Sequence, residues 1–127
     1  MVVYKMARVI HFERAADDPQ RAIAFYETVF GWQIKTWEGP VEDWLISTGP
    51  EDEPGIDGGL ARRADPGVGT ENTIGVDSLD EALAGVEANG GTIIRPKQAV
   101  PGVGWMAYCR DTEGNTFGIM QEDASVA

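Results

Sequence analysis

One histidine and two glutamates are the residues of this sequence best suited to chemistry. His11, the only histidine, lies in a short strand-like run at residues 7–13. Glu13 follows two residues later, so in an extended strand it shares the face of His11. An imidazole titrates near neutral pH, which suits a general base, a ligand-binding donor or a metal ligand. Glu71 could orient the imidazole if its strand lies beside that of His11, and a purely structural strand histidine remains the alternative.

Two tryptophans begin strand candidates and form a second group of interest. Trp44 opens "WLIST" within residues 43–48, and Trp105 follows Gly104 in "GWMAYCR". Aromatic walls suit flat or cationic ligands through stacking and cation–π contacts. We therefore predict a ligand-binding role for Trp44, Trp105 and Glu13, with core or dimer packing as the alternative for the two tryptophans. Cys109 has no neighbouring base to activate it, which indicates a buried structural thiol.

The elements that must position these residues occur twice, 60 residues apart. Residues 17–34 align without a gap with residues 77–94, at an offset that preserves the apolar positions of both segments. Each segment repeats apolar residues at helical spacing. Asp18 before a proline, and Ser78 in the second segment, are the expected N-caps. Glycines at 31 and at 90–91 are placed where each helix is expected to end.

Strand candidates surround each helix in the same order. One short apolar strand precedes each helix, at residues 7–13 and 72–77, and three follow it, at 32–38, 43–48 and 56–63 and at 91–97, 104–110 and 116–122. Each half is thus predicted as a βαβββ module, the first at about 7–63 and the second at about 71–122, with a linker at 64–70. Because a half alone buries little core, we expect a single α+β domain over residues 1–127. In it, the curved mixed sheets of the two tandem modules surround a central cleft.

These features resemble the vicinal oxygen chelate superfamily, also called the glyoxalase/bleomycin-resistance fold. The resemblance is carried by "IHFERAADDPQRAIAFYETVFGW" near the start and by "VDSLDEALAGVEANGG" and "DTEGNTFGIM" in the second half. Members of the family include metal-dependent isomerases, dioxygenases, thiol transferases and antibiotic-sequestering proteins without chemistry. The resemblance therefore implies a fold rather than a reaction. It also implies a homodimer.

The metal enzymes of this family place their ligands on the inner faces of paired strands, away from the helices, and take one ligand from the first strand and one from the last strand of each half. The resemblance implies that these positions are occupied here by His11, Gly58, Glu71 and Gly118. A catalytic metal site needs about three protein ligands, and glycine supplies no side-chain ligand. We therefore expect no metal and no other cofactor. If a divalent metal does bind, His11, Glu13 and Glu71 are its candidate ligands.

Composition excludes several classes of partner. The formal charge of −11 argues against nucleic acid, because phosphate binding needs clustered lysines and arginines. No apolar run approaches the roughly 20 residues of a membrane span, so we expect no membrane partner. The start of the chain lacks the pattern of a signal peptide. Together with the single cysteine, this predicts a cytoplasmic location.

Two hypotheses of function follow from these residues. The first is a small-molecule binding protein of the glyoxalase/bleomycin-resistance fold, without the usual metal site, that sequesters or acts on an organic ligand. The second is a glyoxalase-like lyase or isomerase that uses His11 with Glu13 or Glu71, as metal ligands or as an acid–base pair next to a carbonyl. The sequence leaves the choice between a binding protein and an enzyme open.

Overall fold

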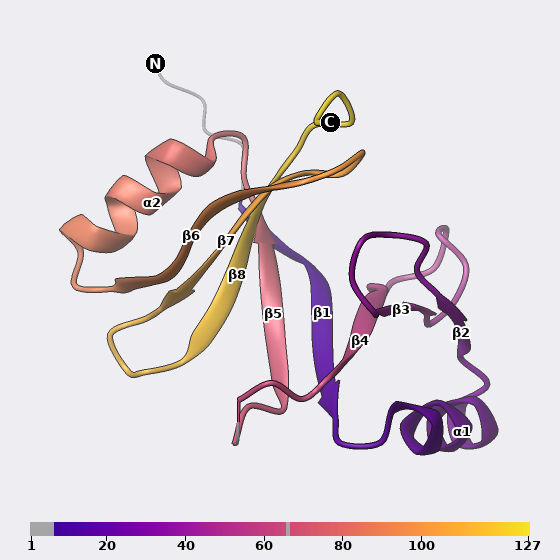
Figure 1. Cartoon of the computed structure of the whole chain (residues 1–127). Coiled ribbons are helices and arrows are strands. Elements are labelled where there is room, and N and C mark those ends of the chain that lie inside the picture. Colours follow the sequence, from indigo (N-terminus) through magenta and orange to yellow (C-terminus); the bar gives the residue numbers. More distant parts are fainter. Residues whose placement is uncertain (1–6, 66) are drawn as a thin grey trace. The chain divides into compact units, whose positions relative to one another are not determined.

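The computed structural model of the chain describes residues 7–65 and 67–127, and it forms two βαβββ halves in succession (Figure 1). The elements are β1 (Arg8–Ala16), α1 (Pro19–Phe30), β2 (Gln33–Thr36), β3 (Trp44–Ser47), β4 (Gly58–Arg62), β5 (Thr70–Gly75), α2 (Leu79–Ala88), β6 (Thr92–Val100), β7 (Gly104–Arg110) and β8 (Thr116–Glu122). This order confirms the expected α+β fold of two βαβββ modules.

The described chain divides into two compact units. The first unit is Ile10–Glu71, and the second is Asn72–Ala127 together with the first residues of β1. The linker was expected at 64–70. Residue 66 of that stretch lies outside the described residues, and β5 already begins at Thr70. The expected module boundaries stay a prediction.

Both helices begin at the caps that their sequences predict. The Asp18 side chain accepts a hydrogen bond from the Arg21 backbone N–H at 3.2 Å, and the helix ends at Gly31, whose φ of 71° suits glycine. In α2 the Ser78 hydroxyl accepts from the Glu81 backbone N–H at 3.2 Å. Each cap satisfies a backbone donor that the first turn of a helix leaves without an intrahelical partner.

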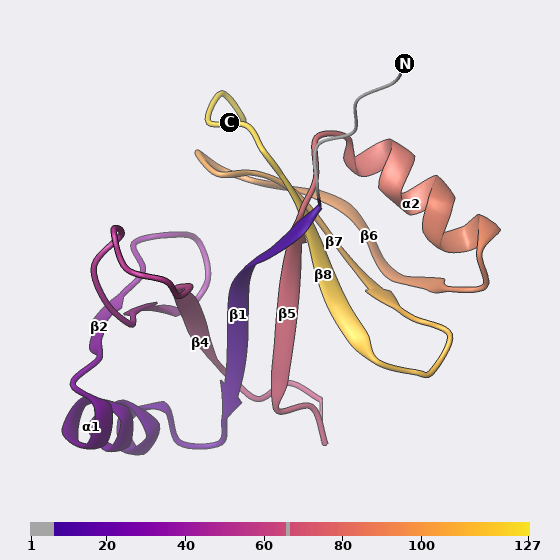
Figure 2. The same cartoon turned by 180° about the vertical axis from the view of Figure 1, so that it is seen from behind.

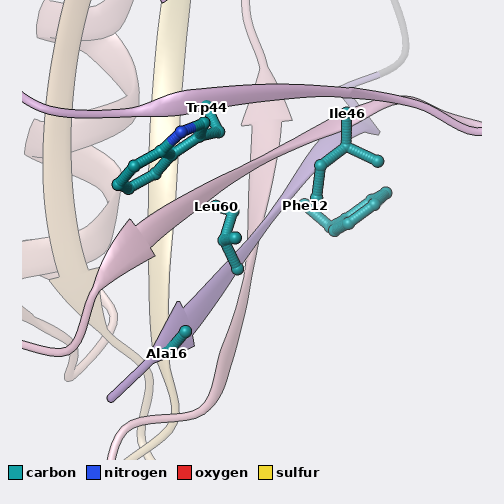
Figure 3. Packing of buried hydrophobic residues seen from close by; sticks show 5 residues of the cluster. All are labelled: Phe12, Ala16, Trp44, Ile46 and Leu60. Atoms are coloured by element: carbon teal, nitrogen blue, oxygen red, sulfur yellow. The ribbon is translucent and has the colours of Figure 1, made fainter. Parts of the chain in front are cut away.

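In the first unit the strand order is β2-β3-β4-β1, with β1 parallel to β4 and the other neighbours antiparallel. Its core consists of alternate residues from three strands, which Figure 3 shows extending from the ribbon: Phe12, Ala16, Trp44, Ile46 and Leu60. Ala22 and Ile23 of α1 pack against this cluster. Because strand side chains alternate between faces, the residues between the core positions lie on the face opposite to α1.

In the second unit the strand order is β5-β8-β7-β6, with β5 parallel to β8 and the other neighbours antiparallel. Helix α2 lies alongside β6 in both views (Figures 1 and 2) and contacts β6, β7 and β8. The core under the helix is formed by Leu79, Ala107, Cys109 and Ile119. Within the described part of the chain, neither helix has the length and apolar character needed to cross a membrane.

Candidate functional site

His11 and Glu13 lie together on the β1 face opposite to α1. Their side chains are 31% and 36% exposed, and the distance from His11 Nε2 to Glu13 Oε1 is 4.0 Å. The residues on either side of Glu13 point the other way, since Phe12 belongs to the core and Arg14 reaches Tyr26 of α1. The alternation of β1 therefore presents one imidazole and one carboxylate on the same surface.

Strand β4 gives this surface a floor of very small residues. Gly59 pairs with Glu13 of β1 on one side and with Leu45 of β3 on the other. A Cβ atom at Gly59 would lie 3.5 Å from His11 Nε2 and 3.6 Å from the Trp44 carbonyl oxygen, so the imidazole lies directly over this glycine. Ala61 is the next β4 residue on the same face, because Leu60 between them is in the core.

Asp43 adds a second carboxyl group to this face. It directly precedes Trp44, whose ring is in the core, so the alternation places Asp43 on the opposite side. Its carbonyl accepts a hydrogen bond from the Trp37 N–H at 2.9 Å, which holds the backbone in place. Burial, with a smaller contribution from the negative charges of Glu13 and Glu42, raises the pKa of Asp43 from 3.8 to about 6. Asp43 therefore exchanges a proton close to neutral pH.

We call the surface formed by His11, Glu13, Asp43, Gly59 and Ala61 the Gly59 face. Burial lowers the pKa of His11 below 6.5, and the charge of Asp57 opposes this effect. At neutral pH the imidazole is therefore uncharged and can accept a proton. The face thus combines a neutral base, a carboxylate and a carboxyl group that titrates near neutrality, a grouping common at functional sites.

Asp43 was not among the site residues predicted from the sequence. It lies 30 residues from Glu13, and the two come from strands that are separated by β4. Only the combination of strand order β3-β4-β1 with the small β4 residues brings the two carboxyl groups into electrostatic contact. The one local signal was an acidic residue directly before a strand tryptophan.

The structure corrects the face assigned to Gly58. A Cβ atom at Gly58 would lie 2.6 Å from ring atoms of Phe12, which is a core residue, so Gly58 belongs to the α1 face. Its neighbour Gly59 is the β4 glycine beside His11. In β8, by contrast, Gly118 lies on the face opposite to α2, as expected, because its neighbours Phe117 and Ile119 pack with the α2 core. The 60-residue offset that fits the helices is therefore one residue wrong for β4 and β8.

Glu71 lies in β5 within the first unit. Its side chain is partly buried, its Oε2 atom is shielded from solvent, and the residue takes part in an interaction within the structure. Alternation along β5 places Glu71 on the same face as Thr73, which lies 3.1 Å from the Cβ position of Gly118. The catalytic role expected for Glu71 beside His11 stays a prediction.

The two tryptophans lie on the helix-facing sides of their strands. Trp44 is 7% exposed and belongs to the first core cluster, and Trp105 is a partly buried residue packed against the second. The Lys97 ammonium lies 4.8 Å from the centre of the Trp105 ring. These positions favour the packing interpretation for both rings, and their ligand-binding role stays a prediction. Cys109 is fully buried, and burial raises the pKa of its thiol, which suits a structural residue.

The donor side chains of the described residues do not form a metal site. Among residues 7–65 and 67–127, no three His, Cys, Asp or Glu side chains are grouped so that they could hold a metal ion. His11 and Glu13 are neighbours, but two donors fall short of the three ligands that a catalytic site needs. The residues present do not fit the metal that the family resemblance implies. The expectation of no cofactor stays a prediction.

With the fold and this face described, comparison with known proteins defines the family. Residues 8–119 match the model of the Glyoxalase/Bleomycin resistance protein/Dioxygenase superfamily. The chain therefore belongs to that superfamily, which confirms the resemblance found in the sequence. No curated protein matches the sequence.

Solved structures with the same fold include both enzymes and proteins of unassigned role. A methylmalonyl-CoA epimerase in complex with methylmalonyl-CoA and NH4+ is 16% identical with a TM-score of 0.71, over 97% of this chain and 99% of that one. The epimerase from Mycobacterium tuberculosis is 12% identical with a TM-score of 0.70, over 97% and 93%. An uncharacterized protein from Methanosarcina mazei is 23% identical with a TM-score of 0.61, over 91% and 94%. At these identities the similarity establishes the fold and not the reaction.

Proposed function

We propose that the chain binds a small organic ligand on the Gly59 face. The observation that carries the proposal is the small-residue floor of Gly59 and Ala61, bordered by the polar side chains of His11, Glu13 and Asp43. Glycine at such a position lets a ligand approach the backbone closely. Polar groups around an open floor supply the few directional contacts that orient a ligand.

The charges of this face indicate the kind of ligand. Glu13 and Asp43 accept hydrogen bonds when ionised, and His11 is uncharged at neutral pH. A ligand with a cationic group or several hydrogen-bond donors is complementary to them. The methylmalonyl-CoA of the epimerase complex carries phosphates and a carboxylate, which this acidic face would repel. The ligand proposed here therefore differs in charge from the one bound by that neighbour.

Proton transfer is the second candidate activity, and the pKa of Asp43 favours it. A carboxyl group with a pKa of about 6 can donate a proton near neutral pH, while the neutral His11 can accept one. Environments that push two pKa values in opposite directions are typical of acid–base pairs. Such a pair would let a glyoxalase-like isomerase or lyase remove a proton next to a carbonyl group and return it elsewhere.

A binding experiment with matched charge variants tests the main proposal. Cationic, neutral and anionic aromatic compounds are titrated by calorimetry into the wild type, Glu13→Gln and Glu51→Gln, the last being an exposed residue in a turn. We expect a cationic or donor-rich compound to bind, and Glu13→Gln to weaken it roughly tenfold through loss of a charge-assisted contact. The control variant is expected to bind as the wild type does. Equal affinities in all three proteins contradict the proposal.

Hydrogen exchange separates the two activities. Carbonyl compounds that bind are incubated in D2O with the wild type and with His11→Ala, and deuterium at the carbon next to the carbonyl is followed by NMR. Exchange that His11→Ala abolishes while binding remains supports the isomerase or lyase. Binding without exchange supports a protein that only holds its ligand. A homodimer, implied by the family resemblance, and a cytoplasmic location stay predictions.

A further inference from the structure

We infer that a cavity on the opposite side of β1, at the start of α1, binds a small molecule through a carboxylate or phosphate group. The cavity has a volume of about 400 Å³. Three arginines line it, Arg14 from β1, Arg21 from α1 and Arg63 after β4, together with the rings of Phe25 and Tyr26. Ligand pockets usually measure about 300–1,000 Å³, so the cavity suits a small metabolite.

Arg14 is held in place by its contacts, and no anion pairs with it among the described residues. Its Nη1 donates a hydrogen bond to the Tyr26 hydroxyl at 2.7 Å, and its guanidinium carbon lies 5.2 Å from the Tyr26 ring centre and 5.7 Å from that of Trp32. Its Nε is shielded from solvent and has no hydrogen-bond partner in the described part of the chain. A partly buried charge without a paired anion is costly. A bound anion would offset that cost at a guanidinium that is already positioned.

The aspartates that also line the cavity are already engaged. Asp17 Oδ1 accepts from Arg63 Nε at 2.8 Å, and Asp18 caps the helix by accepting from the Arg21 backbone N–H. Among the described residues, no ion pair occupies the guanidinium of Arg14 or Arg21. The lining therefore keeps an excess of positive charge, and the N-terminal end of α1 adds to it. Arg14 and Arg21 both line the cavity, so they are the expected contacts of the anionic group.

The apolar part of the lining suggests the rest of the ligand. Leu60 and Ala22 contribute aliphatic surface, and Phe25 is 55% exposed. An aromatic or aliphatic carboxylate, or the monophosphate of such a molecule, would place its acid on the arginines and its body along Phe25. This ligand is opposite in charge to the one proposed for the Gly59 face. The two sites also lie on opposite faces of β1, since Arg14 follows Glu13 directly in the strand.

Inorganic phosphate and benzoate are suitable probes, at constant ionic strength. Trp32 stacks on Tyr26 at 4.9 Å beside Arg14, so tryptophan fluorescence and calorimetry can both report binding. We expect Arg21→Gln to lower the affinity for the anion roughly tenfold, because one charge-assisted contact is lost. The matched control is Arg62→Gln, which removes the same charge from an exposed residue outside the cavity that pairs with Glu42. Benzoate binding alone identifies a carboxylate site, and phosphate binding alone a phosphate site.

A second variant tests the geometry. Arg14→Lys keeps the positive charge but removes the planar guanidinium group. We therefore expect weaker anion binding, with a melting temperature equal to that of the wild type. If Arg14→Lys does not fold, Arg21→Gln decides the matter. Absence of binding by both probes overturns the inference, and so does an equal loss in Arg21→Gln and Arg62→Gln. Neither outcome bears on the Gly59 face, whose ligand and variants are different.

Discussion

The two units use a glycine on the face opposite their helix in different ways. In the first unit, a Cβ atom at Gly59 would meet no atom closer than the 3.5 Å to His11 Nε2. In the second unit, the Cβ position of Gly118 is already approached by the Met106 methyl at 2.8 Å and the Thr73 hydroxyl at 3.1 Å. The first glycine leaves an open polar floor, and the second makes room for neighbouring side chains. A glycine in a similar place thus supports a ligand surface in one unit and close packing in the other.

The helix-facing sides differ in the same sense. In the second unit Leu79, Ala107 and Cys109 are fully buried. In the first unit Arg14 lies among the aromatic rings beside a cavity, and Phe25 of α1 is more than half exposed. Closely packed apolar contacts stabilise a fold, whereas polar groups and cavities cost stability. We therefore expect the second unit to contribute more of the stability and the first unit more of the ligand chemistry.

Replacing Leu79 is expected to have the largest effect. Leu79→Ala removes a fully buried side chain from the core under α2 and should lower the free energy of unfolding by about 2–4 kcal/mol. Ile23→Ala in α1 removes a partly buried side chain and should cost about half as much. Urea unfolding of both variants measures the difference. Equal losses would show that the two units are packed alike.

Paired glycine variants test the comparison directly. Gly118→Ala forces the Met106 methyl and the Thr73 hydroxyl to move, and should cost about 1–2 kcal/mol. Gly59→Ala meets only ordinary contacts, so it should change stability by less than about 1 kcal/mol, in either direction. Thermal unfolding of the two variants gives the comparison. A larger loss for Gly59→Ala would contradict the open floor.

The ionisation of Asp43 gives a smaller, pH-dependent effect. Because its folded pKa is raised from 3.8 to about 6, its contribution to stability is fully present below pH 4 and is lost as the pH rises through 6. Asp43→Asn avoids this loss. Relative to the wild type, the free energy of unfolding of the variant should rise by about 1 kcal/mol when the pH is raised from 4 to 7, after allowance for solvent screening. Urea unfolding at both pH values measures the gain, and the exposed Asp52→Asn serves as control. A gain that does not change with pH would count against the raised pKa.

The smallest expected effect is a shift in the titration of His11. As the only histidine, it can be followed by NMR without assignment by mutation. Burial should place its pKa below 6.5, and Asp57→Asn should lower it further because the Asp57 charge favours the protonated form. Stability linked to the neutral imidazole is then lost as the pH falls below 6.5. A midpoint above 6.5 would mean that the nearby negative charges outweigh the effect of burial on the imidazole.

Local signals in the sequence predicted most of the elements. The structure agrees with the predicted caps at Asp18 and Ser78, with the helix end at Gly31 and with the range 104–110 for β7. These features could be predicted because capping, positive φ and strand alternation depend only on neighbouring residues. The shared face of His11 and Glu13 followed from the same alternation. These features need no knowledge of which strands pair.

The features that were missed depend on strand pairing and register. Asp43 meets the charge of Glu13 only across β4, and no local pattern encodes that neighbour. Gly58 was assigned to the wrong face because the 60-residue offset was extended to β4, where a shift of one residue reverses every side chain.

The open space at Gly59 also bears on how such a face could evolve. A side chain introduced there would begin beside His11 Nε2, and Glu13 is the cross-strand neighbour of the same position. Gly59→Glu or Gly59→His would therefore add a third donor beside the pair in a single step, and the Cβ atom of the new side chain would meet only ordinary contacts. One substitution in the first unit would therefore be enough to bring three potential metal ligands together. In the second unit, a side chain introduced at Gly118 would first have to displace the side chains of Met106 and Thr73.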